Sequence, residues 1–167
     1  YKEVNFSDYV GKGKYVLVDF WSPWCGPCRR EMPNIKQVYD KYKGKDFNVL
    51  SIAVWERQPV EVTIETAAKL NMTWDQINNA QSIPTEIYGV EGIPHVMLIG
   101  PDGTILKRGL HGESIETTVA EYLNMSGYDL MRVAVELNGD IVSKGQYADT
   151  IFKSGDSVEI VSFVGGG

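Results

Sequence analysis

The fold of this chain is decided by one stretch, YVLVDFWSPWCGPC, at residues 15–28. Residues 15–20 form a short, nearly continuous apolar run of β-branched and aromatic side chains, which predicts a buried strand. Ser22 and Pro23 end this strand, and the cysteine motif follows directly. Beyond the motif, apolar residues recur at helical spacing up to Gly44, at Met32, Ile35, Val38, Tyr39 and Tyr42. The cysteine pair is therefore expected at a strand-to-helix junction, on the first turn of the helix.

Further strands and helices are expected along the rest of the chain. Strands are predicted at residues 47–54, 94–99 and 104–110, and helices at about 60–70 and 115–123, with a less regular connection over 73–88. The order β-α-β-α-β-β-α predicts an α/β domain with a mixed sheet. Shorter strands follow at 132–137, 140–142 and 157–164, the first two joined by a tight turn at Asn138-Gly139.

Length, composition and charge exclude several classes of protein. The chain has 167 residues, 43% of them hydrophobic, which suffices for one ordinary domain or two small ones. Its net charge of −6 offers no basic patch for nucleic acid and no reason to bind an anionic membrane. No apolar run approaches the roughly 18 residues of a membrane span. The chain begins at Tyr1 without a signal peptide, which is compatible with removal of an upstream targeting or anchoring segment.

The only two cysteines, Cys25 and Cys28, sit three positions apart, so both sulfurs belong to one local motif. Disulfide exchange needs a thiolate, and the partial positive charge at a helix N-terminus stabilises one. Cys25 would lie there with a lowered pKa and attack. Cys28, one turn further in, would resolve the mixed disulfide. Gly26 and Pro27 allow the turn that holds the two sulfurs close.

The same cysteine spacing could instead be half of a zinc site. Zinc takes about four ligands, and the other soft candidates are His95 and His111, without a second cysteine pair. A metal site within one chain is therefore disfavoured, whereas a cluster shared between two chains stays open. We predict no metal and no cofactor other than a redox-active disulfide.

Three separated segments resemble one family in the same order. Residues 16–28 closely resemble the active-site strand and loop of thioredoxin, and residues 28–33, CRREMP, look like the TlpA/ResA branch of extracytoplasmic bacterial thiol-disulfide oxidoreductases. Residues 55–92 resemble the insertion of that branch, and Gly92-Ile93-Pro94 resembles its cis-proline loop. The resemblance covers about residues 1–124. It implies a thioredoxin fold, with a central mixed sheet flanked by helices. It also implies an enzyme that reduces or exchanges protein disulfides and works with an electron-donating or electron-accepting redox partner.

The resemblance also assigns proton-transfer roles near the dithiol. Asp19 matches the buried carboxylate beneath the cysteines. A carboxylate in an apolar setting has a raised pKa and can relay a proton to Cys28. Glu31 is a second candidate for proton relay. The alternative interpretation is that Glu31 is an ordinary solvated residue of the helix.

Substrate contacts are expected next to the dithiol. By the resemblance, Pro94 is cis and faces the cysteines, and Ile93 offers its backbone to a bound substrate strand. Trp24 is expected to pack beside Cys25 and to shape the contact surface. The other tryptophans are expected to pack in the core or in the insertion: Trp21, Trp55 and Trp74.

The C-terminal segment resembles a different family. Residues 133–142 and 155–167 are similar to ThiS, the small sulfur carrier of thiamine biosynthesis, which has a ubiquitin-like β-grasp fold. The resemblance implies that Gly166 and Gly167 form the sulfur-carrier terminus, whose last glycine is adenylated by a partner enzyme and converted to a thiocarboxylate. A tail without side chains can thread a narrow active site, although a frayed glycine terminus is the simpler interpretation.

The two resemblances compete for the same residues. A β-grasp begins with a hairpin and a helix. Before residue 133, a hairpin followed by a helix is predicted at residues 94–110 and 115–123. We predict that the thioredoxin sheet holds the hairpin, because a strand edge takes one neighbour. The domains then fall at 1–124 and 125–167, the second an incomplete β-grasp that shares helix 115–123. Such a chain is a hybrid or a recombined sequence.

The leading functional hypothesis is a thiol-disulfide oxidoreductase, because its domain is nearly complete. The alternatives are a sulfur carrier that needs a free Gly167, and a binding protein whose dithiol is inert or holds metal. The oxidoreductase resemblance points to the bacterial cell envelope, and a functional carrier segment would point to the cytoplasm. The CGPC motif leaves the direction of electron flow open.

Overall fold

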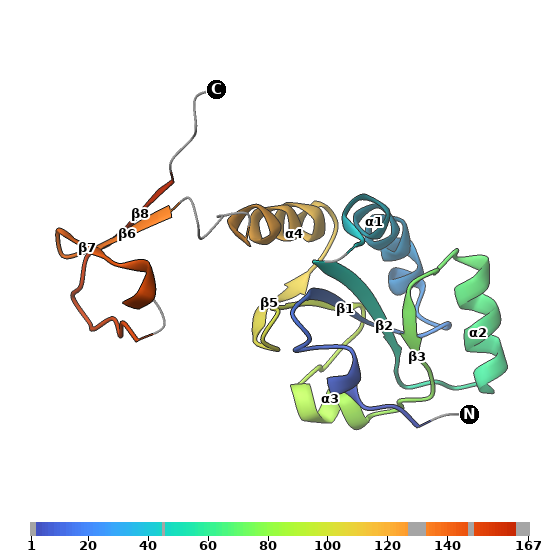
Figure 1. Ribbon diagram of the computed structural model, residues 1–167. Coiled ribbons are helices and arrows are strands. Elements are labelled where there is room, and N and C mark those ends of the chain that lie inside the picture. The colour runs from blue at the N-terminus through green and yellow to red at the C-terminus, as the bar shows by residue number, and fades with distance from the viewer. Residues whose placement is uncertain (1–2, 45, 127–132, 147–148, 163–167) are drawn as a thin grey trace. The chain divides into compact units, whose positions relative to one another are not determined.

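The computed structural model describes residues 3–44, 46–126, 133–146 and 149–162 (Figure 1). The chain forms two compact units, Tyr1–Glu121 and Tyr122–Gly167. The first unit begins with a short 3-10 helix, η1 (Phe6–Asp8). Its strands are β1 (Tyr15–Trp21), β2 (Phe47–Ala53), β3 (Asp75–Ile77), β4 (His95–Ile99) and β5 (Ile105–Leu110). Its helices are α1 (Gly26–Tyr42), α2 (Val60–Lys69), α3 (Ile83–Tyr88) and α4 (Glu113–Ser126), and the boundary between the units falls within α4.

The five strands form one mixed sheet in the order β3-β2-β1-β4-β5. β1 pairs in parallel with β2, and β2 with β3, whereas β4 pairs antiparallel with β1, and β5 antiparallel with β4. Figure 1 shows α1 and α4 on one side of this sheet and α3 on the other. The predicted α/β class, a mixed sheet flanked by helices, is confirmed. β1 is the central strand, and it leads directly into the cysteine motif at the start of α1.

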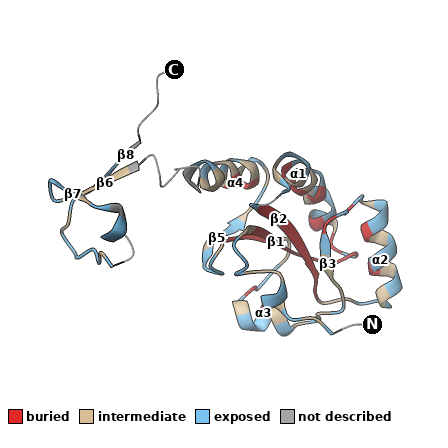
Figure 2. Cartoon of the chain, viewed as in Figure 1, coloured by how far each residue is buried: buried red, intermediate tan, exposed pale blue. Residues whose placement is uncertain are grey.

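The two faces of β1 bury different side chains, because successive residues of a strand point to opposite faces. Val18 and Phe20 lie in an apolar cluster with residues of β2 and β4, partly covered by the N-terminal segment. The opposite face carries Asp19 between Leu17 and Trp21, and all three are fully buried. Figure 2 shows burial concentrated in β1 and β2 and on parts of α1 and α4. Asp19 is thus a carboxylate within an apolar layer.

Segment 73–88 is more regular than predicted. It contains the three-residue strand β3 and the six-residue helix α3. Pro84 lies in the first turn of α3, and the helix ends at Gly89, whose φ of 62° is in the left-handed region. Proline near the start and glycine after the end are helix-boundary signals. Both elements, however, are too short to display the hydrophobic period by which longer elements are recognised.

The second unit, as far as the structure describes it, is a three-stranded antiparallel sheet. It contains β6 (Val133–Leu137), β7 (Asp140–Val142) and β8 (Val158–Ser162) in the order β7-β6-β8, with a 3-10 turn, η2 (Lys144–Gln146). Asn138 and Gly139 join β6 to β7 with φ values of 54° and 91°, the backbone that a two-residue hairpin turn requires. Within the described residues, the predicted strands and the turn between the first two are confirmed, and positions 132, 163 and 164 of the prediction lie outside those residues.

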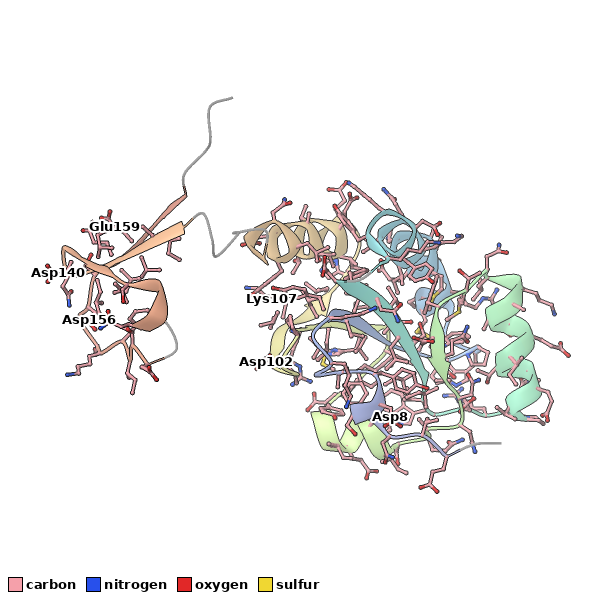
Figure 3. The ribbon with its side chains drawn as sticks, in the orientation of Figure 1. Asp8, Asp102, Lys107, Asp140, Asp156 and Glu159 are labelled. Atoms are coloured by element: carbon pink, nitrogen blue, oxygen red, sulfur yellow. A yellow bond between two sulfur atoms is a disulfide. The ribbon has the colours of Figure 1, made fainter. Side chains whose placement is uncertain are left out.

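Aspartate side chains close turns in both units (Figure 3). In the turn between β4 and β5, Asp102 accepts hydrogen bonds from the backbone N–H and the hydroxyl of Thr104, each at 2.9 Å. These bonds lower the pKa of Asp102. In the second unit, Asp156 accepts hydrogen bonds from Asn138 Nδ2 at 2.8 Å and from the backbone N–H of Lys153 at 2.7 Å. The loop before β8 is thereby tied to the turn between β6 and β7.

The hairpin of β4 and β5 is part of the first unit's sheet, as predicted, because β4 pairs with β1 and β5 with β4. The described strands of the second unit therefore have no separate hairpin before β6. Large apolar side chains are exposed there: Ile141, Ile151, Phe152, Val158 and Ile160. The functional division at residues 124 and 125, with helix 115–123 shared, stays a prediction. Gly166 and Gly167 lie outside the described residues.

Candidate active site at the Cys25–Cys28 pair

The two cysteines occupy the N-terminus of α1, where the sequence predicted them. Cys25 is the N-cap residue, with an extended backbone (φ −79°, ψ 100°), and its Sγ accepts a hydrogen bond from the backbone N–H of Cys28 at 3.1 Å. The two form a disulfide with their Cα atoms 5.2 Å apart. Pro27 fits the first turn because the N–H that it lacks would have no partner there. A sulfur that accepts a helix-terminal N–H is well placed to carry negative charge once the disulfide is reduced.

The cis-proline loop lies against the dithiol. The Ile93–Pro94 peptide bond is cis, as the resemblance implied. The carbonyl oxygen of Ile93 lies 3.7 Å from Cys25 Sγ, although the two residues are 68 positions apart in sequence. Cys25 is 3% exposed and Cys28 is fully buried. The carbonyl of Ile93 therefore lies at Cys25, and the binding of substrate by Ile93 and Pro94 stays a prediction.

Trp24 is held beside the motif by the segment that follows β2. Its indole Nε1 donates a hydrogen bond to the carbonyl oxygen of Trp55 at 2.8 Å, and the guanidinium of Arg57 lies 3.8 Å from the centre of its ring. Trp24 remains 39% exposed, so part of its ring is available to a partner. Sequence reasoning missed Arg57, because no periodic or motif signal connects it with Trp24.

Asp19 is the buried titratable group of the site. Its Oδ2 accepts a hydrogen bond from Ser51 Oγ at 3.1 Å, and its Oδ1 has no partner among the described residues. Burial raises the pKa of Asp19 to about 7, the Ser51 hydrogen bond opposes that rise, and the negative charge of Glu31 adds to it. A carboxyl with this pKa can hold or release a proton near neutral pH. The sequence predicted a raised pKa for Asp19, and burial is its main cause.

Ser51 and Trp74 extend the polar contacts of Asp19 across the sheet. Ser51 of β2 is paired in register with Asp19 of β1, and its Oγ accepts a hydrogen bond from Trp74 Nε1 at 2.8 Å. All three side chains are buried. Sequence reasoning missed Ser51 and assigned Trp74 to packing. The available signal was a single serine in the otherwise apolar run VLSIA.

Glu31 connects α1 to the loop before α4. Its Oε1 accepts hydrogen bonds from Asn34 Nδ2 at 2.7 Å and from the backbone N–H of Gly112 at 3.0 Å. Gly112 has a φ of 53°, so this loop takes a left-handed backbone where it meets Glu31. The half-buried carboxylate therefore has a structural contact besides its electrostatic effect on Asp19. Its role in proton relay stays a prediction.

A metal cluster, His95 and a surface groove are the other features that could form a site. In the parts of the chain that the structure describes, no three His, Cys, Asp or Glu side chains gather as a metal site. His95 is paired with Phe20, and burial, with a contribution from the charge of Arg108, lowers its pKa. A groove of about 900 Å³ between the N-terminal segment, α2 and α3 is lined by neither cysteine nor by Asp19.

Within residues 3–44, 46–126, 133–146 and 149–162, no helix combines the length and the apolar character that crossing a bilayer requires.

The fold and the site together define a class of protein. A dithiol at the N-terminus of the helix that follows the central strand, with a cis-proline loop against it, is a thioredoxin-type site for thiol-disulfide exchange. Similarity to known proteins agrees with this class. The AhpC/TSA family model matches residues 1–108. Thiol-disulfide oxidoreductase ResA of Bacillus anthracis is 30% identical over 122 residues, which cover 73% of this chain and 68% of that protein.

Solved structures show the same fold at similar identity. The thioredoxin domain of a thiol-disulfide oxidoreductase from Bacteroides vulgatus is 31% identical, with a TM-score of 0.64 over 72% of this chain and 86% of that one. A thiol:disulfide interchange protein from Bacteroides sp. is also 31% identical, with a TM-score of 0.63 over 72% and 79% of the two chains. The chain belongs to the AhpC/TSA family, and it is a thiol-disulfide oxidoreductase.

The C-terminal segment matches a second family. The ThiS family model covers residues 106–167. This match begins inside β5 and runs through α4 and β6 to β8, so it overlaps the first family match at residues 106–108. The resemblance of the C-terminal segment to ThiS is confirmed, and its strands are consistent with part of a β-grasp. The strand that opens the ThiS match, β5, is paired in the first unit's sheet.

Proposed function

We propose that the chain transfers electrons between its dithiol and disulfides of other proteins, through Cys25. In the reducing direction, the Cys25 thiolate attacks one substrate sulfur, a mixed disulfide forms, and the other substrate sulfur leaves as a thiolate. Cys28 then attacks Cys25, which forms the Cys25–Cys28 disulfide and releases the second substrate thiol. Two electrons pass to the substrate, and the reverse sequence oxidises it. The observation that supports this most is the hydrogen bond from the Cys28 N–H to Cys25 Sγ at 3.1 Å.

Asp19 is the proposed base for the second step. The Cys28 thiol must lose its proton before it attacks, and a carboxylate with a pKa of about 7 can accept it near neutral pH. Glu31 is proposed to assist this transfer, by tuning Asp19 through its charge or as a second relay. After the step, the proton passes to the leaving substrate thiolate or to water, so no other cofactor is needed.

Three residues are proposed to bind the substrate. The backbone of Ile93 at the dithiol supports pairing with an extended substrate strand beside its disulfide, next to Pro94. The exposed part of the Trp24 ring supports contact with apolar residues on the same substrate.

A redox partner must restore the dithiol after each cycle, because each turnover leaves it in the opposite oxidation state. We place the protein in the bacterial cell envelope, since the TlpA/ResA branch that its motifs resemble is extracytoplasmic. Oxidised and reduced protein substrates would both be encountered there.

Two cysteine variants test the proposal with insulin as the protein disulfide. Cys25→Ser should abolish insulin reduction, because no thiolate remains to attack. Cys28→Ser should also stop turnover, yet it should accumulate a mixed disulfide between Cys25 and insulin that mass spectrometry detects. The matched control is Ser22→Ala, which leaves both thiols in place. Insulin reduction by Cys25→Ser at the wild-type rate would contradict the proposal.

A sulfur-carrier function is the second candidate, favoured by the ThiS match over residues 106–167. In that function the carboxylate of Gly167 attacks the α-phosphate of ATP on an adenylating enzyme, and the acyl-adenylate forms as pyrophosphate leaves. Incubation with ATP and a ThiS-adenylating enzyme should then add the mass of one adenylyl group, which is AMP less one water, to the chain. A chain extended by one residue after Gly167 is the control and should gain no adduct. An unmodified wild-type chain would contradict this function.

A further inference from the structure

A line of polar groups crosses the apolar layer between the central strands and leads to Asp19. Trp74 Nε1 donates to Ser51 Oγ at 2.8 Å, and Ser51 Oγ donates to Asp19 Oδ2 at 3.1 Å. Asp19 and Ser51 are 0% exposed, and Trp74 is 5% exposed. Burying polar groups costs free energy unless they are paired, and an apolar side chain would fill the same space without that cost. The pairing of these three groups therefore points to a role besides packing.

The direction of these hydrogen bonds is determined by the chemistry of the groups. An indole N–H can only donate, so Ser51 Oγ must accept from Trp74. The single hydrogen of the Ser51 hydroxyl is then free to point at Asp19 Oδ2. The line thus presents a donor to one oxygen of the carboxylate and leaves Oδ1 as the oxygen without a partner. A proton that arrives at Asp19 can bind Oδ1 without breaking either hydrogen bond.

The other groups around Asp19 do not supply this function. From α1, Cys28 is buried in a disulfide and Glu31 adds negative charge, which favours the protonated carboxyl. From β4, Val96 is paired with Asp19 and is apolar. His95 is paired with Phe20, and its side chain therefore lies on the opposite face of the sheet. Ser51 is the one hydrogen-bond donor to Asp19 within the described part of the chain.

We propose that Ser51 and Trp74 are positioning residues for disulfide exchange, which hold Asp19 by Oδ2 so that Oδ1 alone takes up and releases the proton. This inference rests on the proposed role of Asp19 as the base for Cys28. Trp74 acts through Ser51, because its N–H occupies the serine oxygen and so orients the serine hydrogen. Neither residue needs to touch substrate.

The test is the pH dependence of insulin reduction from pH 5 to 9. Ser51→Ala removes the donor that favours the ionised carboxylate, so the pKa of Asp19 rises and the acid limb of the rate profile moves to higher pH. A hydrogen bond to a charged group is worth about one pKa unit or more. The rate of insulin reduction on the acid limb should therefore fall about tenfold, while the rate on the alkaline plateau stays unchanged. Trp74→Phe should move the limb in the same direction by a smaller amount. Ser51→Thr retains the hydroxyl and should keep the wild-type profile.

A second readout does not depend on activity. The Asp19 carboxyl carbon, labelled with ¹³C, should titrate at higher pH in Ser51→Ala and in Trp74→Phe than in the wild-type oxidised protein. If Ser51→Ala does not fold, the rate profile and the carboxyl titration are both measured on Trp74→Phe. Unchanged rate profiles and titrations in the variants would overturn the inference.

The failure of the inference is distinguishable from the failure of the proposed base. If Asp19→Asn reduces insulin at the wild-type rate over the whole pH range, Asp19 is not the base, and the positioning role of Ser51 and Trp74 is overturned with it. If Asp19→Asn is slow while Ser51→Ala keeps the wild-type profile, the role of Asp19 as the base is supported and only the positioning role is overturned.

Discussion

Replacing Asp19 by asparagine should remove a pH-dependent cost from the stability of the first unit. Burial raises the pKa of Asp19 from 3.8 to about 7. Below pH 3.8 the carboxyl is protonated in both the folded and the unfolded chain, and no cost arises. Between these pH values unfolding releases the proton, so the wild-type protein loses stability as the pH rises. Above about pH 7 the cost is constant at about 4 kcal/mol, because one pKa unit corresponds to about 1.4 kcal/mol.

Asparagine has the shape of aspartate and keeps an acceptor oxygen for Ser51, but it does not titrate. Its amide N–H group lacks a partner where Oδ1 lay, which adds a penalty that does not change with pH. The difference in free energy of unfolding, Asp19→Asn minus wild type, should therefore rise by about 3 to 4 kcal/mol from pH 4 to pH 8.

Urea denaturation of the oxidised proteins, followed by tryptophan fluorescence, measures this difference. The four tryptophans, at positions 21, 24, 55 and 74, all lie in the first unit, so the signal reports that unit. Asp46→Asn, at an exposed position, is the matched control for the loss of one carboxylate. If the difference for Asp19→Asn does not change between pH 4 and pH 8, the reasoning about Asp19 is refuted.

Further substitutions test other contacts. Ile115 of α4 is fully buried, so Ile115→Ala should lower the free energy of unfolding by about 2–5 kcal/mol, and unchanged stability in urea would exclude α4 from the first unit's core. Glu31→Ala should cost about 1–2 kcal/mol by releasing the Gly112 N–H, whereas Glu31→Gln keeps the acceptor, and equal urea midpoints for the two would contradict this contact. Gly139 has a φ of 91°, so Gly139→Ala should destabilise the second unit by about 1 kcal/mol, seen as faster amide exchange in β6 and β7. Gly145→Ala, without such a backbone, should leave that exchange unchanged.

The central strand, the dithiol and the first helix could be predicted because their signals are local. A continuous apolar run, a break at Ser22-Pro23 and a helical repeat follow each other within the printed sequence. The hairpin at Asn138-Gly139 was likewise predictable, because few residue pairs adopt a left-handed backbone at both turn positions. β3 and α3 were missed because three and six residues are too few to show a period.

The groups around Asp19 could not be predicted because they meet across the fold. Ser51 is 32 positions from Asp19, and Trp74 is 23 positions from Ser51. Their contact depends on the register of β1 with β2 and on the path of the segment before β3. Arg57 reaches Trp24 through a similar long connection. Hydrophobic pattern reports which side chains are buried, but it carries no information about which buried polar groups are partners.

Thiol-disulfide exchange at Cys25 is tested most directly by alkylation of Cys25 over a pH series in the reduced protein, followed by mass spectrometry, together with insulin reduction. We expect Cys25 to react with a pKa well below the ordinary cysteine value of about 8.5 and insulin to be reduced. A Cys25 that titrates as an ordinary thiol, in a protein that leaves insulin intact, would contradict thiol-disulfide exchange at this site.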